Sequence, residues 1–441
     1  MKKMKKILQL SLITSITMTL SVAELSAQID NLANLSPEYV RTGARNAATD
    51  APDAAVYNPA GLTNLNDGFH ISVGNQSLFR SPSHEYDLGL GEGKKSFTQD
   101  GADWFLPNIY GAWKKNNVSV YGGFYISGGG ATANYTKGSI NTDLISMMAL
   151  MQAQGAYQST KDQFLEASSA YSTYFTGVAV QPVNKLSLAF SAKFISAKNT
   201  TNAGVTMFSS PLELPDAPLA VDYDETASGF GFAFSANYQV AEPVLVTVRY
   251  ETNTELDFET STTTDDLGIA QDGTKSRRDL PGILAVGIKA DLNEKLTVMA
   301  DFNHYFQKNA DWGTTTDFEG NEVNWSDLAG DASLYGISFE YKITDQLSAS
   351  LGTVYTAFEY PEKDMYFTKA GAFETVIDDN ISLNTGLKYT MNEKFAFNVG
   401  FMQNIWEKDV KVKALNAYPL DVDVTTNNSM STLALGVNMT F

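Results

Sequence analysis

The sequence predicts an all-β fold: a transmembrane antiparallel β-barrel of about fourteen strands, with an N-terminal hatch (a plug) inside the lumen. Three observations predict this fold. Apolar residues alternate with small or polar ones along most of the chain, the connections between these stretches are short and long in turn, and no apolar run after residue 27 is long enough for a membrane-spanning helix. Only a closed barrel then pairs every backbone group within the bilayer.

The alternation is clearest at the end of the chain. A strand with one apolar and one small or polar face is predicted there by the alternation of Leu433, Leu435, Val437, Met439 and Phe441 with Ala434, Gly436, Asn438 and Thr440. A C-terminal aromatic residue is usual in bacterial outer-membrane barrels, so we expect Phe441 to serve the barrel-assembly machinery. We therefore expect the bacterial outer membrane as the location, with outer-membrane lipid and lipopolysaccharide around the barrel.

The remaining strands follow from the same two-residue period, with about 10 residues for each tilted crossing. The predicted spans are 68–79, 105–114, 117–127, 172–182, 185–197, 227–240, 243–256, 280–292, 295–307, 331–343, 346–358, 380–390, 394–405 and 430–441. Tight turns such as Lys115-Asn116 and Asn392-Glu393 follow the even-numbered strands, and long loops rich in Asp, Thr, Gly and Pro follow the odd-numbered ones. A soluble β-sandwich would give no such regular asymmetry, which is typical of an outer-membrane barrel.

The chain before the barrel divides into two segments. Residues 1–27 read as a cleaved signal peptide, with a basic start, an apolar stretch and the small residues Ser26-Ala27 before the cleavage point; the alternative is an uncleaved anchor. Residues 28–67 are rich in alanine, and we expect them to form the hatch, because a lumen of this size is too wide for its own side chains to fill. The alternative is a flexible periplasmic tail. The barrel, with long extracellular loops, takes residues 68–441.

Composition excludes several function classes. A formal net charge of -19 argues against nucleic acid as a partner, because affinity for polyphosphate comes from Lys and Arg. Three widely separated histidines give no transition-metal site, no Gly-x-Ser-x-Gly elbow is present, and the absence of cysteine rules out a disulfide framework. We therefore expect neither an enzyme nor a cofactor.

Two motifs in the predicted hatch carry a family resemblance. Thr42-Gly43-Ala44, and the stretch 54–62 with its Asn58-Pro59-Ala60 triplet, resemble the N-terminal hatch of the FadL family of outer-membrane long-chain fatty-acid and hydrocarbon transporters. Leu106-Pro107-Asn108 and Leu280-Pro281 at the start of two predicted strands are similar to that family as well. The resemblance implies passive uptake of a long-chain fatty acid or another hydrophobic small molecule.

The resemblance also implies a route. Ligand settles on an apolar patch among the outer loops, moves to a lumen site against the hatch, and leaves sideways where the third strand is kinked. Gly128, Gly129 and Gly130 are the predicted kink; alternatively they only begin the outer loop. The loop 139–170, with Leu144, Met147, Met148 and Met151 and then Phe164 and Leu165, suggests amphipathic helices that form the patch or simply cap the rim.

Candidate ligand contacts follow from residue type and position. Ile29, Leu32 and Leu35 are the expected contacts of the ligand tail, and Arg41, Arg45, Lys193 and Arg249 are candidates for an anionic head group. The alternative for the basic residues is pairing with Asp301, Glu251 or Glu340 in lumenal charge networks. Two other functions stay open, a general porin for polar solutes and a plugged surface adhesin or scaffold.

Overall fold

The computed structural model describes residues 36–89, 91, 93–99, 101–209, 214–418 and 420–441. Fourteen antiparallel strands form a closed ring in the order of the chain, because β1 pairs with β22 and β8 pairs with β9. The ring consists of β1 (Gly68–Arg80), β4 (Ala102–Lys115), β5 (Val118–Tyr135), β6 (Ser159–Val183), β7 (Leu186–Ser209), β8 (Leu214–Ala241), β9 (Val244–Glu251), β12 (Gly282–Asp291), β13 (Leu296–Phe306), β16 (Ala332–Lys342), β17 (Leu347–Phe358), β18 (Asn380–Thr390), β19 (Phe395–Trp406) and β22 (Met430–Thr440). Each predicted strand has its counterpart in this ring, so the predicted barrel is confirmed.

The outer face of the ring is apolar, as the alternation predicts. In β8, Phe230, Phe232 and Phe234 are 68%, 43% and 51% exposed, whereas Ala233 between them is buried. In the last strand Leu435 is exposed and Ala434 is buried. The side chains that face outward are therefore those that lipid would solvate.

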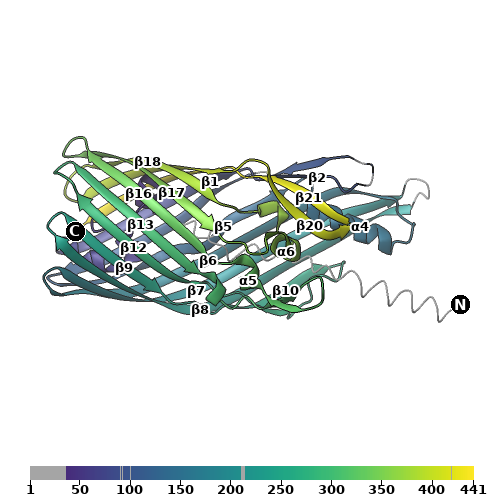
Figure 1. The fold of residues 1–441 in the computed structure, drawn as a ribbon, viewed down its shortest axis with the longest axis horizontal. Helices are drawn as coiled ribbons and strands as arrows, with labels where there is room; N and C mark the ends of the chain where they lie inside the picture. The colour runs from purple at the N-terminus through teal and green to yellow at the C-terminus, as the bar shows by residue number, and fades with distance from the viewer. Residues whose placement is uncertain (1–35, 90, 92, 100, 210–213, 419) are drawn as a thin grey trace.

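Several strands are longer than a membrane crossing needs. β6, β7 and β8 have 25, 24 and 28 residues, and Figure 1 shows them extending beyond the far ends of their neighbours. β10 (Asp257–Asp265) and β11 (Lys275–Arg277) continue the sheet along the outer part of β8. The prediction of helix around Phe164 and Leu165 is wrong: both lie in β6, opposite Gly204 and Ala203 of β7. Continued pairing with β7 keeps this stretch extended.

A cap covers the end of the barrel away from the C-terminus (Figure 1). It combines a four-stranded sheet with short helices around one hydrophobic core that includes Ile145, Trp325 and Phe367. The sheet is formed by β2 (Ser83–Tyr86), β3 (Lys95–Thr98), β20 (Val410–Tyr418) and β21 (Leu420–Asn427); the helices are α4 (Ile140–Gln152), α5 (Trp325–Ala329) and α6 (Lys363–Ala370), with η3 (Gln307–Asn309), η4 (Phe373–Thr375) and the hairpin of β14 (Thr314–Thr316) and β15 (Glu322–Asn324) nearby. None of the helices in the described ranges is long and apolar enough to cross a membrane.

Residues 36–67, called the inner segment below, precede the first strand. They contain α2 (Pro37–Thr42), α3 (Ala54–Tyr57) and the 3-10 helix η2 (Pro59–Asn64). α2 contacts strands from β16 round to β1, and η2 contacts β4 to β8 on the other side of the ring. The inner segment therefore crosses the space that the strands enclose.

Candidate functional site

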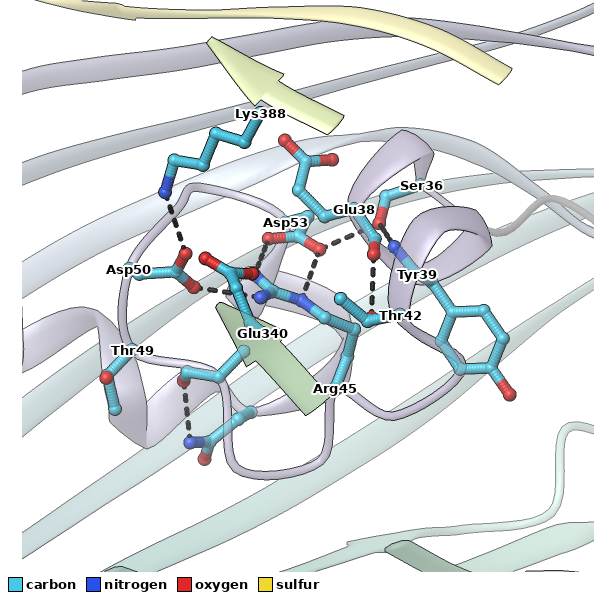
Figure 2. Close-up of polar contacts among 12 residues, drawn as sticks. Ser36, Glu38, Tyr39, Thr42, Arg45, Thr49, Asp50, Asp53, Glu340 and Lys388 are labelled. Carbon is cyan, nitrogen blue, oxygen red and sulfur yellow. Dashed lines mark hydrogen bonds and ion pairs between the residues drawn. The ribbon is translucent and has the colours of Figure 1, made fainter. Parts of the chain in front are cut away.

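A buried charge network folds the inner segment around Arg45 (Figure 2). The Arg45 side chain is inaccessible to solvent and donates to both carboxylate oxygens of Asp53, at 3.0 and 2.5 Å, and to Asp50 at 2.8 Å. Asp53 also accepts a hydrogen bond from the Ser36 hydroxyl at 2.7 Å, and Asp50 pairs with Lys388 of β18 at 3.0 Å. Burial opposes the charge on Arg45, but Asp50 and Asp53 keep its pKa well above the usual range.

Two further charged residues connect α2 to the barrel wall. Arg41 pairs with Glu340 and also donates to Asn398 at 3.1 Å. Glu38 accepts hydrogen bonds from Asn398 and Asn438, at 2.9 and 2.8 Å, on one carboxylate oxygen. Burial, followed by the nearby charge of Asp53, raises the pKa of Glu38 to about 7. The neutral, protonated form of Glu38 is therefore favoured up to a higher pH than for a free carboxyl group.

The Asn58-Pro59-Ala60 motif forms the turn between α3 and η2. The Asn58 side chain donates to the carbonyl of Ala48 at 2.9 Å, and the Ala60 amide donates to Ser235 of β8 at 3.4 Å. Pro59 occupies the first turn of η2, where its missing amide hydrogen costs nothing. The motif therefore joins the two halves of the inner segment and attaches them to β8.

A cavity of about 290 Å³ lies between the inner segment and the cap. Tyr39, Asn46, Val56 and Tyr57 of the inner segment line one side of it. Apolar side chains from the wall line much of the rest, among them Leu78, Ile126, Ile195, Leu280, Ile283, Leu334, Val354, Phe358, Met402 and Met430. Ser, Thr and Asn side chains are also frequent in the lining, so the cavity offers both apolar surface and polar groups to a small molecule.

Three of the four charged residues that line this cavity lie together at the end of β9, around Glu251; the fourth, Arg80, pairs with Asp103 instead. Both Lys193 of β7 and Arg249 of β9 pair with the Glu251 carboxylate, and Lys193 also lies 3.3 Å from the Tyr125 hydroxyl. Tyr125 lines the cavity too. Lys193 and Arg249 are buried, and the Arg249 Nε atom has no hydrogen-bond partner among the described residues. Two cations and one carboxylate leave a net positive charge that suits an anionic head group.

The wall is interrupted between β4 and β5. Their ladder ends at Ile109 and Phe124, although each strand continues and pairs with its other neighbour. Farther out, the two strands are joined through Asp103, which accepts hydrogen bonds from the Thr132 amide and hydroxyl at 3.1 and 2.8 Å. Residues 104–106 and 125–129 thus frame a gap, called the β4–β5 window, and the cavity is lined by Ile126 and Thr132 near it.

The predicted kink glycines lie within β5 at this window, not at the start of a loop. The pairing of β5 with β6 shifts register between Ile126 and Gly128 and again between Gly129 and Ala131; Gly130 lies within the second shift. A Cβ on Gly128 would lie 2.2 Å from the Tyr171 ring, and Gly129 has a φ of +65° with Ser169 O at 2.3 Å from its Cβ position. Only glycine fits this backbone path.

The structure separates the predicted ligand contacts. Lys193 and Arg249 line the cavity, whereas Arg41 and Arg45 are committed to the networks of the inner segment and are not among the lining residues. Leu144 is only 4% exposed in the cap core, Met147 and Met148 are half-buried, and Met151 is 45% exposed. Ile29, Leu32 and Leu35, with the signal peptide and residues 28–35 of the predicted hatch, lie outside the described residues. Sequence reasoning did not single out Tyr39, Tyr57 or Tyr125 for the cavity.

Comparison with known proteins adds the fold-level context. No protein-family model matches the sequence, and no curated protein sequence matches it. Among solved structures, a Pseudomonas aeruginosa FadL homologue is similar over 93% of this chain and 99% of its own, with 11% identity and a TM-score of 0.66. The Ralstonia pickettii toluene transporter TbuX matches over 94% and 100% of the two chains, with 16% identity and a TM-score of 0.61.

The Pseudomonas putida toluene transporter TodX gives similar values, with 93% and 99% of the two chains covered, 13% identity and a TM-score of 0.59. At these identities the likeness concerns the fold. The expected resemblance to the FadL family is therefore confirmed at that level: this chain has the fold of the FadL-type proteins.

Proposed function

We propose that the protein mediates passive uptake of hydrophobic compounds, and in particular of amphiphiles with an anionic head group, across the bacterial outer membrane. The observation that carries the proposal is the apolar cavity with Lys193 and Arg249 beside a single carboxylate. Each buried CH2 of a ligand tail contributes about 0.8 kcal/mol, so a pocket of this kind captures a long tail well. The head group would be held by charge-assisted hydrogen bonds.

The inner segment acts in this proposal as a hatch. It fills the space between the cavity and the barrel end at which the strands are joined by short turns. This obstruction favours a ligand carrier over an open porin. The β4–β5 window supports release of the ligand sideways, because the cavity reaches the β4–β5 seam beyond the end of the ladder between the two strands. Kink residues Gly128 and Gly129 hold β5 away from β4 there.

A binding measurement tests the proposal. The full-length protein in detergent should bind a fluorescent long-chain carboxylate saturably, and unlabelled long-chain carboxylate should compete for the site. The matched alcohol should compete more weakly, because it cannot use Lys193 and Arg249 equally well. Absence of saturable binding, together with binding of a surface ligand by the loops alone, would favour the adhesin or scaffold alternative.

A further inference from the structure

A second interruption of the ring lies between β8 and β9. Their ladder runs from Ala241–Val244 to Ala233–Glu251, and pairing of β8 resumes only with β10, at Thr226 and Glu259. Between these points the connector 252–258 runs beside residues 227–232 of β8. The two are joined at one place, where the Thr252 amide donates to the Phe232 carbonyl at 2.9 Å and the Thr252 hydroxyl accepts from the Phe232 amide at 3.0 Å.

The connector is hydrogen-bonded to the opposite side instead. Thr254 exchanges two backbone hydrogen bonds of 3.0 Å with Leu280, and the Asn253 side chain accepts from the Gly282 amide at 2.6 Å. Because the Phe232 backbone groups point toward the connector, those of Phe230 and Ser228 point the same way. Within the described ranges, no hydrogen bond joins Phe230 or Ser228 to residues 252–258.

Contact without pairing is made possible by two glycines of β8. A Cβ on Gly229 would lie 2.1 Å from the Glu255 carbonyl oxygen, and one on Gly231 would lie 2.3 Å from the Thr254 hydroxyl. The side chains of β8 at odd positions face inward, so the connector lies against the inner surface of the strand rather than beside its edge. Because no ladder of backbone hydrogen bonds joins β8 to the connector here, the two can move apart without breaking one.

The seam lies at the level of an outward-facing aromatic row. Phe124, Tyr174, Phe194 and Phe230 are register partners across β5 to β8, and the pairs Phe124–Tyr174 and Phe194–Phe230 have ring centroids 5.1 Å apart. The row runs from the end of the β4–β5 ladder to the β8 seam. Aromatic residues facing outward are typical of the lipid-facing surface of outer-membrane barrels, so the row indicates lipid-facing surface between the two interruptions.

The cavity reaches the second seam too. Gly231, Phe232, Thr252 and Thr254 line it, immediately beside Glu251 of the basic cluster. Backbone groups left without partners at membrane depth are expensive unless they line a polar or ligand-filled space. The geometry points to a second lateral opening, the β8 slit, through which hydrophobic ligands pass between the cavity and the bilayer. This inference rests on the proposed function, since it needs a ligand in the cavity.

Photolabelling and cross-linking of the full chain test the slit. The sequence contains no cysteine, so Ser228→Cys with Glu255→Cys supplies a unique exposed pair, one on each side of the seam, for bifunctional thiol reagents of graded length. The control is Ile337→Cys with Thr353→Cys, register partners in the intact β16–β17 ladder. A diazirine-bearing long-chain carboxylate, followed by mass spectrometry of the labelled peptides, reports where the ligand passes.

We expect labelling at residues 230–232 and 252–254 as well as at the β4–β5 window. Cross-linking the slit pair should abolish labelling at residues 230–232 and 252–254 and slow transfer of the ligand to vesicles, while the affinity of the cavity stays unchanged. Cross-linking the control pair should change neither the labelling nor the rate of transfer. Gly229→Val, which pushes the connector away, should increase labelling of the slit. Labelling confined to the β4–β5 window, with transfer unaffected by the slit cross-link, would overturn the second opening and leave the proposed function standing. Loss of saturable binding in every variant would instead mark failure of the proposed function.

Discussion

Replacement of Arg45 by methionine should loosen the inner segment while leaving the barrel intact. Met has a similar length but removes the charge that Asp53 and Asp50 pair with. Asp53 is inaccessible to solvent, so its carboxylate would be left buried, and among the described residues the Ser36 hydroxyl would be its remaining side-chain donor. Breaking a buried ion pair from one side costs about 3–5 kcal/mol, which corresponds to roughly two to four decades in the opening equilibrium of the segment.

Hydrogen–deuterium exchange in detergent, read peptide by peptide, measures this effect. Peptides within 36–67 should exchange faster in Arg45→Met, while peptides from β12 to β18 keep their protection. Lys388→Met is the matched control: its pair with Asp50 is partly exposed, at 19% and 35% for the two side chains, so the expected loss is about 1 kcal/mol or less. Arg45→Met with Asp53→Asn should recover part of the lost protection. Unchanged exchange of the inner segment in Arg45→Met would refute the assignment of this network as its main anchor.

Three further predictions follow from the site. Burial raises the pKa of Glu38 to about 7 from an unfolded value of 4.5, so the free energy that protects α2 from hydrogen exchange should be greatest below pH 4.5. It should fall as pH rises toward 7, by about 3 kcal/mol in all. Glu38→Gln should flatten this dependence in exchange measured across pH. Lys193→Met or Arg249→Met should weaken binding of a long-chain carboxylate by about 1.5–3 kcal/mol, or roughly 10- to 150-fold. The affinity for the matched alcohol should change little in the same competition assay. Equal losses of affinity for both ligands would count against a head-group role. Gly128→Val should lower thermal stability or reshape β5, because its side chain meets Tyr171. Gly111→Val, whose added Cβ would have no atom nearer than 3.9 Å, should not affect the melting temperature; a fully stable Gly128→Val barrel would argue against a required kink.

Local pattern predicts the barrel well because the lipid and the lumen impose a two-residue period on every strand. The same reasoning underestimates β6, which pairs with β7 from Ser159 onward, because a strand length derived from bilayer thickness says nothing of sheet beyond the membrane. The apolar pattern of the loop 139–170 predicts helix at Phe164 and Leu165, but long-range pairing with β7, which a local pattern does not reveal, keeps both residues extended. The helix around Leu144 is correctly predicted, but its burial in the cap depends on loops from distant parts of the chain.

The candidate site divides in the same way. Alternation is enough to place Lys193 and Arg249 on the inner face and to offer Glu251 as an ionic partner. It does not distinguish them from Arg41, which meets Glu340 across the lumen, because that choice depends on the path of the inner segment. The β8 slit has no local signal except Gly229 and Gly231, whose meaning depends on where residues 254–255 lie.

Transfer of a long-chain carboxylate into proteoliposomes with an internal reporter tests the central claim most directly. The wild-type protein should speed uptake well beyond protein-free vesicles, Lys193→Met should reduce that gain, and sucrose should not pass. Uptake no faster than in empty vesicles, together with a large steady ohmic current in planar bilayers, would contradict a plugged carrier of amphiphiles and indicate an open porin.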